Sequence, residues 1–174
     1  MEVRRMAWGR ALVLLVGTVG CSNQTGPGVD GVAFLRASPT GGAVSVATDA
    51  SMVLQFSGSM MAGMERYVDL HRGHLQDPTV PMTCSWSTDR STVSCRTDGT
   101  LDANTMYTLH MGGGLRGSDG QEIEMDSHRE MMGGQWADQA SSGGMHSGMT
   151  MGNMDPGWRN GNGSLGMRFE FRTR

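Results

Sequence analysis

Lysine is absent from this chain of 174 residues: all 14 basic residues are arginine, against 17 acidic residues, and the formal net charge is -3. Proteins that bind nucleic acid normally present a basic face, so this balance excludes nucleic acid as an expected partner. Charged residues make up only 18% of the chain and aromatic residues only 6%, whereas glycine occurs 27 times and methionine 17 times. Short apolar runs separated by glycine and serine are more typical of a β protein than of a helical one.

Long hydrophobic runs are also absent. Near the N-terminus, three arginines precede the apolar run from Ala11 to Val16, and small residues then lead to Cys21. The run is far shorter than the ~20 residues that a membrane-spanning helix needs. A basic start, a short apolar stretch and small residues are the layout of a secretory signal peptide, which we predict over residues 1–20.

The end of this leader, "TVGC", resembles the lipobox of bacterial lipoproteins, in which the cysteine becomes the lipidated N-terminus. Gly20 fits that motif, but Thr18 departs from it because leucine is usual there, so cleavage by the ordinary signal peptidase stays an alternative. Ser22 after the cysteine points to the outer membrane if the host is Gram-negative. We therefore predict a lipid on Cys21, a membrane as partner through that lipid, and a location in the periplasm or at the cell surface.

One domain is expected to follow the leader. Residues 21–31 contain Gly26, Pro27 and Gly28 and have no apolar periodicity, which predicts a flexible tether. Residues 32–174 are long enough for one domain with one core.

Only three cysteines are present. With Cys21 lipidated, Cys84 and Cys95 remain, and an exported protein is expected to oxidise them. "MTCSWSTDRSTVSC" has the pattern of a hairpin in which Trp86 faces Val93 and Cys84 faces Cys95, because alternate residues point to the same side of a strand. A disulfide is the favoured prediction. The alternative, two cysteine ligands for a metal, is weaker because no second pair exists.

Short runs of alternating apolar and polar residues continue along the domain. Such alternation predicts antiparallel sheets with one buried and one solvated face. Six or seven strands in this length predict an all-β fold in which two antiparallel sheets pack as a sandwich. The clearest apolar sets are Met52, Leu54 and Phe56; Val68 and Leu70; Tyr107, Leu109 and Met111; and Leu165, Met167, Phe169 and Phe171.

Residues 36–60, "RASPTGGAVSVATDASMVLQFSGSM", resemble the opening of bacterial Ig-like domains of the SbsA type. The matching positions are Ser38, Pro39, Phe56, Ser57 and Met60. "LDANTMYTLHM" resembles a later strand of that family and the tyrosine corner of Ig domains, in which the Tyr107 hydroxyl would bond to nearby backbone.

The resemblance covers roughly residues 32–126 and 164–173. It implies an Ig-like antiparallel β-sandwich of about seven strands outside the cytoplasm. Such a domain is used for adhesion, spacing or binding of an unknown protein or surface ligand, and the resemblance implies no catalytic residues. The departure is residues 127–163, where the family pattern needs only a short link. This Met- and Gly-rich stretch has no sustained period, which predicts a long irregular insertion before the last strand.

The insertion contains a candidate metal site. Thioether sulfur is a soft, uncharged ligand that suits Cu(I) or Ag(I), and glycines let a segment wrap around an ion. The arrangement resembles, in composition and spacing, the Met-His segments of periplasmic copper-resistance proteins of the CopC type. The predicted ligands are Met145, His146, Met149, Met151 and Met154, with His128, Met131 and Met132 at the other end of the insertion and His110 and Met111 expected near the same rim.

A plainer interpretation competes with metal binding. Methionine fills irregular gaps, and packing of the insertion onto the open end of the sandwich is the favoured interpretation. The residues suited to it are Met131, Met132, Trp136, Trp158 and Met167. The usual ligand spacing of zinc sites is absent, and so are the common nucleophile, phosphate-loop and metalloprotease motifs. The chain is therefore not expected to be an enzyme.

Overall fold

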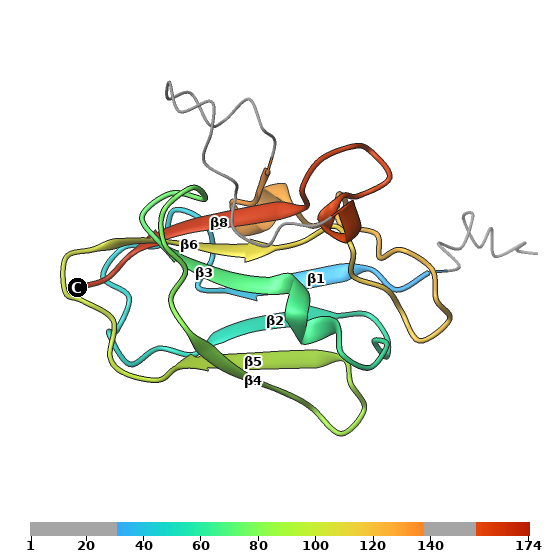
Figure 1. The fold of residues 1–174 in the computed structure, drawn as a ribbon, viewed down its shortest axis with the longest axis horizontal. Helices are drawn as coiled ribbons and strands as arrows, with labels where there is room; N and C mark the ends of the chain where they lie inside the picture. Colours follow the sequence, from blue (N-terminus) through green and yellow to red (C-terminus); the bar gives the residue numbers. More distant parts are fainter. Residues whose placement is uncertain (1–30, 138–155) are drawn as a thin grey trace, which may run out of the picture.

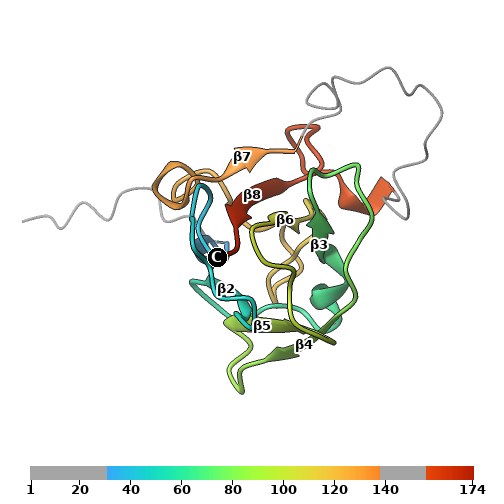
Figure 2. The same cartoon turned by 90° about the vertical axis from the view of Figure 1, so that its left-hand side faces the viewer.

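The computed structural model describes residues 31–137 and 156–174. Within these ranges the chain forms two four-stranded antiparallel sheets that lie face to face (Figures 1 and 2). This confirms the predicted Ig-like sandwich. The first sheet has the order β1 (Phe34–Ser38), β2 (Met52–Phe56), β5 (Thr92–Thr97) and β4 (Met82–Trp86), and the second has the order β3 (Val68–Arg72), β6 (Met106–Met111), β8 (Met167–Arg172) and β7 (Gln135–Trp136).

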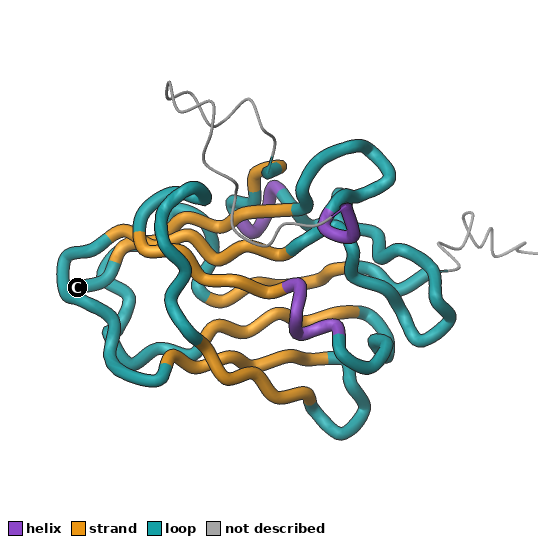
Figure 3. The backbone as a smooth tube through the Cα atoms, in the orientation of Figure 1, coloured by secondary structure: helices purple, strands orange, loops and turns teal. Residues whose placement is uncertain are grey.

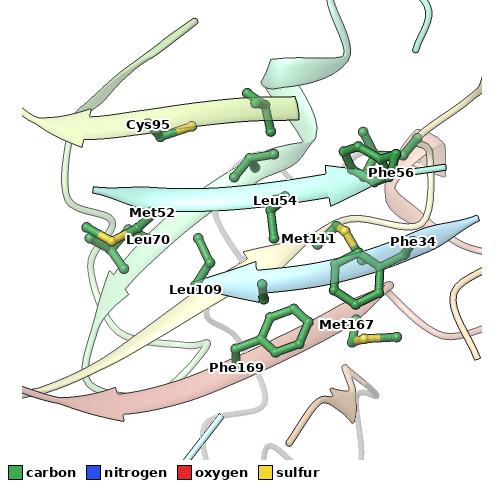
Figure 4. Packing of buried hydrophobic residues seen from close by; sticks show 14 of the residues in the cluster. Phe34, Met52, Leu54, Phe56, Leu70, Cys95, Leu109, Met111, Met167 and Phe169 are labelled. Atoms are coloured by element: carbon green, nitrogen blue, oxygen red, sulfur yellow. The ribbon is translucent and has the colours of Figure 1, made fainter. Parts of the chain in front are cut away.

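The core lies between the two sheets and is built from the residues that alternate inward on each strand. Figure 4 shows Phe34 and Leu54 from the first sheet meeting Leu109 and Phe169 from the second. The rings of Phe34 and Phe169 have centroids 5.6 Å apart, and both side chains are fully buried. The predicted apolar alternation is thus the source of the core.

The β4–β5 hairpin has the predicted register. Cys84 lies opposite Cys95 and Trp86 lies opposite Val93. Cys84 and Cys95 form a disulfide with their Cα atoms 4.0 Å apart. Trp86 also packs its ring 6.1 Å from that of Phe56, so the hairpin face that carries the disulfide is turned toward the core.

A tyrosine corner ties the start of β6 to the loop before it. The backbone N–H of Asp102 donates a hydrogen bond to the Tyr107 hydroxyl at 2.9 Å. The Tyr107 ring is buried and stacks on Phe171 of β8 with centroids 5.8 Å apart. The feature that the resemblance implied is therefore present.

The insertion is less irregular than predicted. Its described beginning contains the 3-10 helix η2 (Glu130–Met132) and strand β7, which pairs with β8 at the edge of the second sheet, and its described end contains η3 (Pro156–Trp158) (Figure 3). The Arg129 guanidinium lies over the Trp136 ring and its Nε donates to Asp126 at 2.9 Å. These contacts hold a strand of two residues, which is too short to show any period in the sequence.

The last predicted strand begins later than expected. Leu165 was assigned to the alternating core set, but β8 starts at Met167. Gly166 adopts a φ of 92°, a conformation that side-chain-bearing residues rarely take, and this turn breaks the alternation. Leu165 consequently lies outside the sandwich core, in a second apolar cluster.

The helical elements in the described part of the chain are short. None of them has the length or apolar character needed to cross a bilayer.

Candidate metal centre

The candidate site lies on the outer face of the second sheet. Asp69 of β3 is directly opposite His110 of β6, and His71 is two residues further along β3. Residues two apart on a strand point to the same side, so all three side chains share the face opposite to the core residues Leu70 and Leu109.

A second apolar cluster packs beside this polar face; we call it the outer cluster. It consists of Leu75, Ala137, Trp158 and Leu165, with Tyr67 at the end of η1 (Met64–Tyr67) packed against it. The Trp158 ring stacks on His110 with centroids 5.2 Å apart and an interplanar angle of 18°. As a result His110 is fully buried and His71 is only 4% exposed.

Three consecutive glycines at the end of β6 explain how the segment around η3 comes so close. A Cβ atom at Gly112 would overlap the Trp158 ring, one at Gly113 would overlap the backbone of Asn160, and one at Gly114 would overlap the Gly157 carbonyl. In Figure 1 the short helix η3 accordingly lies against the end of β6. The absence of side chains there lets Trp158 reach His110.

His110 is held as a neutral imidazole. Its Nε2 lies 2.7 Å from the Leu165 carbonyl oxygen, and because a carbonyl only accepts, Nε2 carries the proton. Burial lowers the pKa of His110 to about 4, so the ring is uncharged near neutral pH. Its other nitrogen, Nδ1, is therefore an unprotonated acceptor, and it is buried without a hydrogen-bond partner.

His71 has the complementary arrangement. Its Nδ1 lies 3.0 Å from the Asp77 carbonyl oxygen and donates to it, which leaves Nε2 as the free nitrogen. That nitrogen is also buried without a partner. The third member, Asp69, is partly buried, and burial raises the pKa of its carboxyl group.

These groups are close enough to share one ion. One ligand atom from each of Asp69, His71 and His110 lies within 4.8 Å of the other two. The set offers two imidazoles and a carboxylate, which are ligands of divalent transition metals.

The structure describes only some of the ligands predicted from the sequence. Met145, His146, Met149, Met151 and Met154 lie outside the described residues. Met131 is 67% exposed, whereas Met132 packs against the core beside the turn where Gly41 donates to its carbonyl. His128 is half-buried and does not join the cluster of Asp69, His71 and His110.

His110 and Met111 were both expected near the rim that carries the insertion, but only His110 lies there. His110 does contact the insertion, through Trp158. Met111 is fully buried in the core on the opposite face of β6, because neighbouring residues of a strand point to opposite sides. Met111 is therefore excluded as a partner of the insertion.

The cluster itself was missed in the sequence. The two histidines stand on β3 and β6, with the whole β4–β5 hairpin between them in sequence, so they do not form a zinc-like spacing within one segment. The available signal was polar residues at positions 69, 71 and 110 that alternate with buried leucines, a pattern that also fits an ordinary solvated strand face.

Several solved structures match part of this chain at low similarity. L,D-transpeptidase 3 from Mycobacterium tuberculosis matches with 20% identity over 53% of this chain and 37% of its own, at a TM-score of 0.37. The surface layer protein SbsC matches with 13% identity over 54% of this chain and 12% of its own, at a TM-score of 0.40. L,D-transpeptidase 1 from Mycobacterium tuberculosis matches with 13% identity over 62% of this chain and 54% of its own, at a TM-score of 0.37.

This chain thus spans less than two thirds of the length of each of these chains. No curated protein matches it. The family model described as Bacterial Ig-like domain matches residues 29–129, which is more than half of the chain. Together with the two-sheet sandwich described above, this match shows that the chain belongs to the bacterial Ig-like domain family.

Proposed function

We propose that the chain is an exported, lipid-anchored Ig-like module with a structural or binding role and no catalytic one. Family membership supports an extracytoplasmic structural or binding domain. The observation that carries the proposal is the disulfide between Cys84 and Cys95, because such bonds persist in oxidising compartments outside the cytoplasm. The signal-peptide pattern of residues 1–20 agrees with it.

The lipid would sit on Cys21, and residues 21–31 would connect it to the sandwich. A tether of this length spans at most ~35 Å when fully extended. The domain would therefore stay near the membrane surface, where its partner is a protein or another surface ligand rather than a nucleic acid.

The anchor predicts a defined N-terminus. When the full chain is expressed in a bacterial host, mass spectrometry is expected to find a mature chain that begins at a lipid-modified Cys21 and fractionates with membranes. A Cys21→Ser variant should lose both properties, whereas Cys84→Ser should keep the lipid, because Cys84 lies in the folded domain. A mature chain that starts elsewhere, without lipid, would refute the anchor.

A second candidate function is Cu(I) or Ag(I) capture by the insertion. It is favoured by Met131, which is 67% exposed and so contributes no core packing at the near end of the Met-rich segment. Exposed thioethers suit these soft ions and stay available where thiols are oxidised. The proposed ligands are Met145, His146, Met149, Met151 and Met154, assisted by His128 and Met131.

Titration with Cu(I) under reducing conditions tests this function. The parent protein is expected to bind tightly and in a fixed ratio, and a variant with Met145, Met149, Met151 and Met154 changed to leucine should lose that binding. Met61→Leu is the matched control, since Met61 is also partly exposed but lies in the first half of the domain. Equal Cu(I) uptake by the parent and the four-site variant would end this proposal.

A further inference from the structure

We propose that Asp69, His71 and His110 form a binding site for one divalent transition-metal ion, with Zn²⁺ as the best match. None of the three ligands belongs to the Met-rich segment, and imidazole nitrogen and carboxylate oxygen are harder ligands than thioether sulfur. It also does not depend on the structural or binding role proposed above. The three side chains converge on the outer face of the second sheet, with ligand atoms within 4.8 Å of one another.

The hydrogen bonds around the histidines are the first argument. A metal-ligating histidine usually donates its non-ligating N–H to a carbonyl or carboxylate, which selects the tautomer and orients the ring. His110 does this to the Leu165 carbonyl and His71 does it to the Asp77 carbonyl. Each ring is thereby oriented by one nitrogen and has its other nitrogen left over.

The second argument is that both remaining nitrogens are buried and lack a partner. They are Nε2 of His71 and Nδ1 of His110. Buried polar atoms in native proteins are normally hydrogen-bonded, so each exception needs an explanation. When both imidazoles are neutral, these nitrogens on adjacent strands cannot satisfy each other, because each ring has already used its one N–H on a carbonyl. A cation, or a water that donates to both, would satisfy them.

The third argument is geometry. Zinc binds imidazole nitrogen at about 2.0–2.1 Å and carboxylate oxygen at about 2.0–2.2 Å, so atoms that share one ion lie roughly 3–4 Å apart. The three ligand atoms lie within 4.8 Å of one another, so an ion would draw them together by about 1 Å. Asp69 is the least buried of the three residues and provides the side from which an ion would enter.

The ligand set also selects among metals. Two neutral imidazoles and one carboxylate suit Zn²⁺, Cu²⁺, Ni²⁺ or Co²⁺, whereas Ca²⁺ and Mg²⁺ prefer oxygen and Cu(I) prefers sulfur. Three protein ligands leave a fourth position for water. Trp158, stacked on His110, would shield the ion and place an indole beside it.

Calorimetric titration of metal-stripped, tag-free protein with Zn²⁺ tests the site, with Co²⁺ absorption as the readout of coordination geometry. The parent is expected to bind one ion and to show the visible bands of four-coordinate Co²⁺. His71→Gln, His110→Gln and Asp69→Asn should each weaken Zn²⁺ binding by more than the ~10–100-fold that loss of an outer hydrogen-bond partner costs.

His74→Gln is the matched control. His74 is on the loop just after β3 and its side chain is 61% exposed, so the change should leave Zn²⁺ affinity as it is. Should a buried histidine variant fail to fold by circular dichroism, Asp69→Asn decides, since its partly exposed isosteric amide preserves the shape. A parent that takes up no Zn²⁺ would show that water fills the site and would overturn the proposal, as would equal affinity in Asp69→Asn and His74→Gln.

Discussion

Replacing Met111 with alanine is expected to lower the free energy of unfolding by about 2–5 kcal/mol. Met111 is fully buried at the end of β6, where it is paired with Val68 of β3 and Met167 of β8, and its side chain points into the core (Figure 4). The change removes apolar surface from the core and leaves a cavity that both sheets enclose, and a closely packed interior closes such a cavity only in part. Urea denaturation followed by circular dichroism measures the difference.

The matched control makes the same change at an exposed methionine. Met131→Ala should alter the free energy of unfolding by less than about 0.5 kcal/mol, because the Met131 side chain is 67% exposed. The two variants distinguish a methionine that packs in the core from a methionine that is exposed to solvent. Equal effects at the two positions would contradict the burial on which this distinction depends.

Removing the disulfide is expected to cost about 3 kcal/mol of unfolding free energy. The bond closes a loop with a sequence separation of 11 residues, and cross-linking a loop of that size restricts the unfolded chain by roughly this amount. A Cys84→Ala/Cys95→Ala double variant avoids leaving a free thiol. Because Cys95 is fully buried, loss of its sulfur from the core adds to the cost.

The measurement is best made in a Cys21→Ser background, where the pair holds the only remaining cysteines. The parent should lose a comparable amount of stability when a reductant is added, and the double variant should not respond to the reductant. A parent whose urea midpoint is the same with and without reductant would show that the cross-link contributes nothing to stability.

The β4–β5 hairpin shows what could be predicted from the residues. Its two strands are neighbours in sequence, so the turn between them decides which side chains are opposite. With Asp89 and Arg90 at the centre of the turn, Trp86 pairs with Val93 and Cys84 pairs with Cys95. Arg90 has a positive φ of 58° in that turn, and Asp89 accepts hydrogen bonds from Ser87 and Ser91.

The insertion shows where such reasoning ends. Strand β7 exists because Gln135 and Trp136 reach the free edge of β8, and Trp158 is buried because three glycines leave room above β6. Neither fact has a periodic pattern to reveal it, since each depends on a partner that is remote in the chain. The sequence shows the tryptophans and the glycines, but it does not show which of them come into contact.

Alternation along single strands was sufficient to predict the β class and the cysteine pairing, because the side-chain period of a strand is a local property. The family followed from the resemblance of residues 36–60 and was shown by the match over residues 29–129. The meeting of Asp69, His71 and His110 needed the folded chain. The three side chains lie together because β3 pairs with β6, although the β4–β5 hairpin separates these strands in sequence. Trp158 then stacks on His110 and helps to bury it. Burial and orientation then turn three common polar side chains into a ligand set, and both are properties of the assembled sheets.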